Sequence, residues 1–164
     1  MSNSAPAPSS TPTPDAHSPA TPPASAASSA SAASASPVLN AEERALVAGP
    51  AVAIVATLEP DGRPQQSVVW IDLDDDELVF STTRARRKAS NLERDPRASI
   101  LVMAEGDADR YLEVRGTVTL HDDTDRSVVN ALARKYTGGD FGGDGPGAQR
   151  VTVRLRPTTV RRKG

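Results

Sequence analysis

Short apolar runs separated by turn residues are the feature that most restricts the fold of this chain. The run "AVAIVATL" (51–58) is followed by the turn signature "EPDGRP" and then by "QQSVVWIDL" (65–73). The segment "DDDE" leads into a third run, "ELVFSTT" (77–83). Runs of this length, rich in β-branched residues and joined by Pro, Gly and Asp, predict antiparallel hairpins. Three further strands are expected over 97–104, 110–120 and 150–157.

Helices are expected between some of these strands. Residues 84–95 look helical and stop before Pro96. Acidic residues at 122–125 can cap a second helix over about 126–136, in which apolar residues share one face. There is no strand–helix–strand alternation and no internal repeat. The pattern therefore predicts a mainly β fold, a small barrel or sandwich of about six strands with two or three short helices.

The composition changes sharply after residue 37. Of the first 37 residues, 33 are Ala, Pro, Ser or Thr, and Asp15 is the only charged side chain among them. Such a segment cannot bury enough apolar surface to offset its ordering entropy, so 1–37 is predicted to be disordered. It has neither the basic start nor the apolar run of a secretory signal. A solvated tail and an over-long gene start both stay open, and residues 38–164 suit one compact domain.

Charge and residue content exclude several classes of protein. All 19 Lys and Arg lie in 38–164 beside 20 of the 21 acids, a balance that argues against a general nucleic-acid or membrane-surface protein. No apolar run approaches a membrane span, and nothing demands export, so a cytoplasmic location is expected. The absence of cysteine excludes disulfides and thiolate chemistry. With His121 as the one histidine of the domain, no metal site is expected, and phosphate-loop, dinucleotide-loop and nucleophile-elbow motifs are missing.

The stretch "STTRARRKASNLERDP" (81–96) carries an unusual concentration of positive charge. Four cations fall in the first turn of the expected helix: Arg84, Arg86, Arg87 and Lys88. A helix N-terminus is itself partially positive and normally prefers acids. A phosphate-type ligand would account for the cations, because backbone N–H groups and guanidinium groups both favour it there. An exposed, solvated face is the alternative, and nucleic acid is a minor one because no aromatic side chain for base stacking lies in the segment.

The run "VAIVATLEPDGRPQQSVVWIDLDDDELVFSTTRARRKASNLERDPRASILV" resembles the pyridoxamine 5′-phosphate oxidase-like split β-barrel superfamily. It is most similar to the actinobacterial branch that binds the deazaflavin F420. The similarity covers about 46–157, and "RRKASNLERDPRASI" is its most distinctive piece. The resemblance implies a split β-barrel that forms a homodimer with cofactor sites at the interface.

The resemblance also implies which residues contact the cofactor. The basic segment would hold the phosphate through Arg86, Arg87, Lys88 and Asn91. The preceding strand end would line the same pocket with Ser81, Thr82 and Thr83. The second strand would lie beside the ring system with Ser67, Val68, Val69 and Trp70.

The function that this resemblance implies is that of an F420-dependent oxidoreductase, which transfers a hydride between the reduced deazaflavin and a small organic substrate. Because the cofactor carries the hydride, no side chain has to be a nucleophile. No catalytic residue is assigned, and packing roles are favoured for Tyr111 and Tyr136 over proton donation. The alternatives are an FMN-dependent oxidase or flavin reductase of the same fold, or a non-catalytic cofactor-binding protein. The substrate and the role of the glycine-rich loop 137–149 are not predicted.

Overall fold

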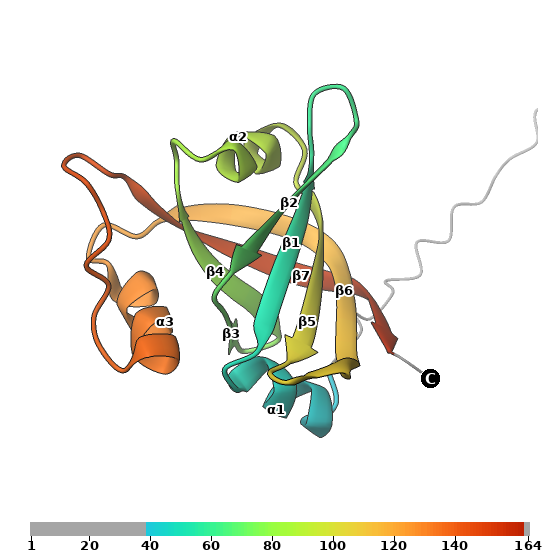
Figure 1. Ribbon diagram of the computed structural model, residues 1–164. Coiled ribbons are helices and arrows are strands. Elements are labelled where there is room, and N and C mark those ends of the chain that lie inside the picture. The colour runs from blue at the N-terminus through green and yellow to red at the C-terminus, as the bar shows by residue number, and fades with distance from the viewer. Residues whose placement is uncertain (1–38, 163–164) are drawn as a thin grey trace, which may run out of the picture. The chain divides into compact units, whose positions relative to one another are not determined.

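A computed structural model describes residues 39–162, and the tail predicted to be disordered, residues 1–37, lies outside them. Within the described part the chain forms three helices: α1 (Ala41–Ala48), α2 (Arg87–Arg94) and α3 (Ser127–Thr137). It also forms seven strands: β1 (Val52–Leu58), β2 (Pro64–Val69), β3 (Ile71–Asp74), β4 (Glu77–Thr83), β5 (Arg97–Ala104), β6 (Asp107–Asp122) and β7 (Arg150–Arg162). The predicted mainly β architecture is confirmed (Figure 1).

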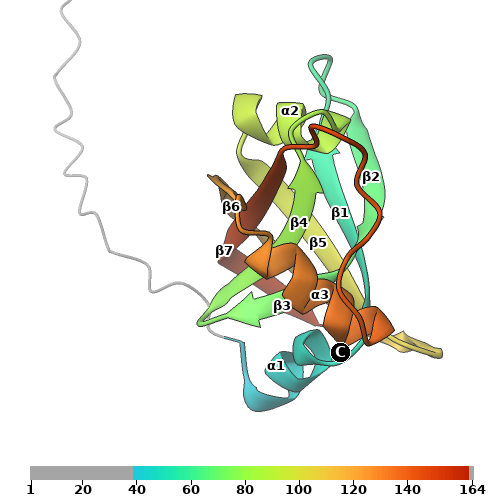
Figure 2. The ribbon, with the colours of Figure 1, turned by 90° about the vertical axis from the view of Figure 1, so that its left-hand side faces the viewer.

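The strands form one sheet in the order β2-β1-β5-β6-β7-β4-β3, and every pair of neighbours is antiparallel. The sheet curls without closing, so β2 and β3 are its two edges, as in a split barrel. The helices α1 and α2 lie at opposite ends of the strands, and α3 lies to one side of the sheet (Figures 1 and 2).

Alternate residues of each strand point into a single apolar core. Along β1 and β5 every second side chain is buried, as the period of two in the sequence predicts. The largest fully buried side chains include Phe80, Ile71, Leu78, Leu92, Ile100, Leu112 and Leu155. Burying each such side chain contributes about 1.5–3 kcal/mol, so this core is the main source of stability.

The structure divides the strand predicted over 65–73 into β2 and β3, with Trp70 between them. The two halves pair at opposite edges of the sheet. Val69 lies opposite Ala53 of β1, whereas Ile71 lies opposite Phe80 of β4. Both Val69 and Ile71 are buried, so the alternation of apolar residues continues across the break and hides the change of partner.

Helix α3 supplies hydrogen bonds where the strand breaks. The Tyr136 hydroxyl donates to the C=O of Ala51 (2.8 Å) and accepts from the N–H of Ile71 (3.2 Å). The ammonium of Lys135 donates to the C=O of Ile71 (2.6 Å). The Trp70 ring stacks on Tyr136 with 5.6 Å between centroids. Because buried backbone groups need partners, these contacts fix the position of the break.

The ends of several elements differ from those predicted. Helix α2 begins at Arg87 rather than at residue 84, because residues 84–86 form a turn. Strand β6 is longer than expected at both ends, and strand β7 is longer than expected at its C-terminal end. Helix α1 was not located from the sequence, although the side chains of Asn40 and Glu43 form a capping box that marks its start.

Replacing Gly116 with Ala should lower the free energy of unfolding by about 1–3 kcal/mol or more. Gly116 lies at a bulge where β6 pairs with β7, and a Cβ atom there would lie 2.1 Å from the carbonyl oxygen of Arg156. A backbone atom cannot move aside as a flexible side chain can. Urea unfolding measures the loss, with Gly139→Ala as the control because nothing lies within 4 Å of that position. Equal midpoints for the two variants would contradict this account of the bulge.

Candidate cofactor-binding site

A hollow of about 250 Å³ lies where the break at Trp70, the end of β4, the start of α2 and the loop after α3 meet. Eight of the eleven side chains predicted to contact a cofactor line it: Val68, Val69, Trp70, Ser81, Thr82, Thr83, Arg86 and Lys88. The other lining residues were not predicted, and they are Val129, Leu132, Phe141 and Arg150. Segments far apart in the sequence therefore converge on one place.

One side of the hollow carries uncompensated positive charge. Within residues 39–162, neither Arg86 nor Lys88 forms an ion pair with a carboxylate. Burial lowers the pKa of Lys88, and the charge on Arg86 lowers that pKa further. Arg86 is also the N-cap of α2, and no side chain caps the first turn. Two neighbouring cations beside an uncapped helix start favour an anionic ligand.

Three of the predicted contacts lie elsewhere. Arg87 points to the β1–β2 hairpin, where its guanidinium is 3.3 Å from the carboxylate of Glu59. Asn91 is buried and donates to the hydroxyl of Thr57 (3.0 Å). The hydroxyl oxygen of Ser67 is buried and has no hydrogen-bond partner among the described residues. Their contact with a cofactor stays a prediction.

Helix α2 begins at Arg87, and this start explains why the side chains of Arg87 and Lys88 point in different directions. Consecutive positions on a helix differ by about 100° in direction, because a turn takes 3.6 residues. Lys88 therefore turns to the hollow and Arg87 turns away from it. Arg84, which precedes the helix, is held by Asp122 (2.6 Å) and Glu93 (2.7 Å).

Apolar and aromatic side chains also line the hollow. Phe141 meets the Trp70 ring edge to face, with 5.9 Å between centroids and 85° between planes. Val68 and Val69 of β2 also line the hollow. Phe141 comes from the glycine-rich loop, which leaves α3 and runs toward the α2 end of the sheet before the chain enters β7 (Figures 1 and 2). A hollow lined by both cations and aromatic rings suits a planar ring that carries a phosphate.

Arg150 is a third cation of the hollow, and no sequence pattern predicts it there. Its guanidinium lies 4.3 Å from the centroid of the Phe141 ring and forms a bidentate ion pair with Asp144. The position of Arg150 follows from the β4–β7 register, in which it lies opposite Thr83. Thr83 and Arg150 are far apart in the sequence, so no local sequence pattern predicts that they lie opposite each other.

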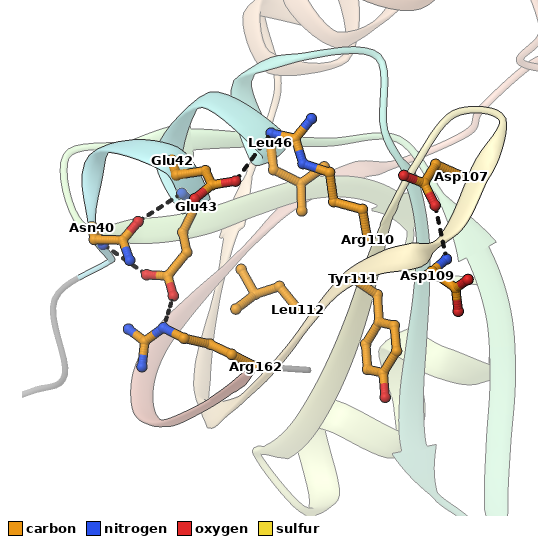
Figure 3. Close-up of a pocket in the computed structure, with 10 residues that line it drawn as sticks. All are labelled: Asn40, Glu42, Glu43, Leu46, Asp107, Asp109, Arg110, Tyr111, Leu112 and Arg162. Atoms are coloured by element: carbon orange, nitrogen blue, oxygen red, sulfur yellow. Dashed lines mark hydrogen bonds and ion pairs between the residues drawn. The ribbon is translucent and has the colours of Figure 1, made fainter. Parts of the chain in front are cut away.

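A second hollow, of about 340 Å³, lies between α1, β6 and the end of β7 (Figure 3). Its cations have carboxylate partners. Arg110 is 3.7 Å from Glu42, and Arg162 pairs with Glu43 (Figure 3). This hollow therefore offers no uncompensated positive charge to a phosphate group, and the hollow at Trp70 is the better candidate.

Candidate groups for other chemistry are not gathered at the hollow. In residues 39–162 no cluster of three or more His, Asp or Glu could hold a metal ion, and none of the described helices could span a membrane. The Tyr136 hydroxyl is engaged by backbone groups, and burial raises its pKa. Tyr111 lines the second hollow instead. The described residues thus suit binding and orientation rather than proton transfer by a tyrosine.

The family described as pyridoxamine 5′-phosphate oxidase matches residues 39–164. The chain belongs to this family. A pyridoxine/pyridoxamine 5′-phosphate oxidase from Citrobacter koseri is 32% identical over 103 residues, which are 57% of this chain and 47% of that protein. The chain thus spans about half the length of the curated relatives it matches.

Solved structures show the same fold. An F420 reductase is 30% identical with a TM-score of 0.67, and the match covers 73% of this chain and 96% of that chain. The conserved hypothetical protein Rv2991 from Mycobacterium tuberculosis is 27% identical with a TM-score of 0.63, and the match covers 77% of this chain and 84% of that one. The split-barrel expectation is confirmed, and the family resemblance is confirmed with it.

Anion binding in the hollow should weaken as the pH rises through the pKa of Lys88, which lies below the usual lysine value. Below that pKa the ammonium is charged and attracts the anion, and above it the attraction is lost. Sulfate is a suitable probe because it keeps both charges in neutral and alkaline solution. Lys88→Arg should retain sulfate at higher pH, since a guanidinium stays protonated. Calorimetric titration at several alkaline pH values measures this, and identical pH profiles would exclude Lys88 as the anion's partner.

Proposed function

We propose that this chain is an oxidoreductase that binds the deazaflavin F420 and transfers a hydride between the reduced cofactor and a small organic substrate. The observation that carries the proposal is that the unpaired cations Arg86 and Lys88 line the same hollow as the aromatic side chains Trp70 and Phe141. The choice of F420 is supported by the F420 reductase whose chain is matched over 96% of its length.

The chain's own residues would bind and orient the cofactor. When bound, the deazaflavin supplies the hydride, so the protein needs no nucleophile. Arg86 and Lys88 would hold the phosphate through charge-assisted hydrogen bonds, with hydroxyl groups of Ser81 and Thr83 beside them. Trp70 and the neighbouring valines would keep water from one side of the ring.

FMN is the second candidate cofactor, in an oxidase or flavin reductase of the same fold. A specific observation favours it. The extended anionic part of F420 would benefit from further free cations, yet Arg84 is paired with Asp122 and Arg97 is paired with Asp95. A single phosphate needs only Arg86 and Lys88. A cofactor-binding protein without turnover is the remaining alternative.

We also propose a homodimer, because one outer face of the sheet is apolar. Its members are Val52, Ile54, Val68, Leu101, Met103 and Tyr111, hereafter the outer apolar face. They lie opposite one another across β2, β1, β5 and β6, and directly opposed residues point to the same side. Val68 is 70% exposed and also lines the hollow. A second copy on this face would therefore cover the hollow's open edge.

The cofactor proposal is tested by titrating the protein with F420 and, separately, with FMN, following cofactor fluorescence. We expect micromolar or tighter binding of F420 and weaker binding of FMN. Arg86→Ala and Lys88→Ala should each weaken F420 binding roughly ten- to hundredfold, since each removes a charge-assisted contact. Arg63→Ala, which removes a cation paired with Asp61 in the hairpin turn, serves as the control.

Each outcome of the titration has a distinct meaning. Tighter binding of FMN would move the chemistry to the flavin alternative while keeping the anion site. Loss of binding in Arg87→Ala equal to that in Lys88→Ala would mean that Arg87 leaves Glu59 to hold the phosphate. Failure of the wild-type protein to bind either cofactor would overturn the proposed function. Retained binding without turnover of any acceptor would support the non-catalytic alternative.

Val52→Lys should convert a dimer into a monomer. The substitution places a charge on the outer apolar face, where Val52 lies opposite Met103, and a buried interface disfavours an unpaired charge. Sedimentation velocity reports the mass of each protein. Thr117→Lys, an exposed change farther along β6 opposite Arg97 and outside this apolar set, should leave the mass unchanged. A wild-type protein that sediments as a monomer would refute the homodimer.

A further inference from the structure

The loop between α3 and β7 combines high intrinsic flexibility with one buried ion pair that anchors it. Half of residues 138–149 are glycine, at positions 138, 139, 142, 143, 145 and 147. At Gly139, Gly142 and Gly145 nothing lies within 4 Å of a Cβ atom, so close packing does not require glycine there. Glycine loses more conformational freedom on ordering than any other residue. Such a loop stays in one conformation only if specific contacts hold it.

Asp144 is the anchor. Its carboxylate accepts from the Nε (2.8 Å) and a terminal nitrogen (2.6 Å) of Arg150 and from a terminal nitrogen of Arg126 (2.9 Å). The side chains of Asp144 and Arg150 are only 9% and 11% exposed. The ion pair with Arg150 lowers the pKa of Asp144 below its usual value. Bidentate, charge-assisted hydrogen bonds of this kind are among the strongest that side chains form.

Asp144 influences the hollow indirectly, through Arg150 and Phe141. Asp144 does not line the hollow, whereas Arg150 and Phe141 do. The Arg150 guanidinium lies 4.3 Å from the Phe141 ring centroid, and Phe141 meets Trp70 edge to face. Arg126, the third partner in this arrangement, also donates to the C=O of Phe141 (2.9 Å). The Asp144 carboxylate thus holds the Arg150 guanidinium against the Phe141 ring. It also holds Arg126, which in turn binds the backbone carbonyl of Phe141.

We propose that Asp144 is a positioning residue that fixes Phe141, through Arg150 and Arg126, as the wall against which a planar aromatic ring packs. Recognition of the ring is then separate from recognition of the phosphate, which depends on Arg86 and Lys88. The ligand class is a flat tricyclic ring of the flavin or deazaflavin type. This inference rests on the proposed function of the hollow as a cofactor site.

The separation has a thermodynamic consequence. If the anchor is removed, a glycine-rich loop samples many conformations, and the cost of ordering it is added to the cost of binding the ring. The anion site is not subject to this cost, because it lies on β4 and α2. Loss of Asp144 also leaves the charge on Arg150 without a counter-ion, which can only favour an anion in the hollow.

The test uses Asp144→Asn with two probes that each carry half of the cofactor. Riboflavin has the ring without the phosphate, and sulfate has the anion without the ring. We expect riboflavin to bind Asp144→Asn about tenfold more weakly than it binds the wild type, a loss of about 1.4 kcal/mol. Sulfate should bind both proteins equally or the variant more tightly. The fluorescence of Trp70, the one tryptophan of the chain, reports binding of either probe.

Asp140→Asn is the matched control. Asp140 is in the same loop, but its partner is the exposed Arg134 (2.7 Å), and neither residue lines the hollow. This variant should bind riboflavin as the wild type does. Equal effects of the two substitutions on riboflavin, or equal weakening of riboflavin and sulfate by Asp144→Asn, would overturn the inference.

Hydrogen exchange of the ligand-free proteins separates failure of this inference from failure of the proposed function. The Phe141 amide donates to Asn130 (3.1 Å) and should exchange faster in Asp144→Asn than in Asp140→Asn. Unchanged exchange would refute the anchor whatever the hollow binds. If exchange is faster but the wild type binds no riboflavin, FMN or F420, the anchor is upheld, and the proposed function and ring recognition are both overturned.

Discussion

The hydrogen bonds made by the backbone of Ile71 are the constraint on which the rest of the structure depends. A strand that changes partners leaves N–H and C=O groups without a ladder, and these groups cannot stay unpaired in a buried position. Tyr136 and Lys135 of α3 satisfy them, while the Trp70 ring is held against Tyr136. The break thereby places β2 and β3 at opposite edges of the sheet. The hollow lies beside this break, so the hydrogen bonds that position the break also position the site.

Charge compensation elsewhere in the domain makes the hollow distinctive. Most described arginines have a carboxylate partner, and exposed pairs such as Arg97 with Asp95 contribute little to stability. Arg86 and Lys88 lack such a partner and lie side by side at the start of α2. A chain gains nothing in stability by leaving two like charges together. A bound anion supplies the attraction that would otherwise be missing, and this physical argument links the site to cofactor binding.

The strands were predictable because their inward residues repeat every second position, and this pattern is local. The break at Trp70 was not predictable, since Val69 and Ile71 preserve the pattern on both sides. Most of the candidate site followed from the family resemblance and from the charge of residues 84–88. Phe141 and Arg150 did not, because the loop after α3 and the β4–β7 register bring them to the hollow from far along the chain. Sequence patterns record neighbours along the chain, whereas long-range register depends on the assembled sheet.

The position of β7 has a consequence for how the domain is made. This strand lies between β6 and β4 and is the last of the described strands in the chain. Until it is synthesised, the strands β2, β1, β5 and β6 can pair with one another, but no strand pairs the β3–β4 hairpin with β6. Both β6 and β4 then expose an unpaired edge, which is a template for aggregation. The described domain therefore depends on the segment that forms β7, and a chain interrupted before residue 150 would leave the edges of β6 and β4 unpaired.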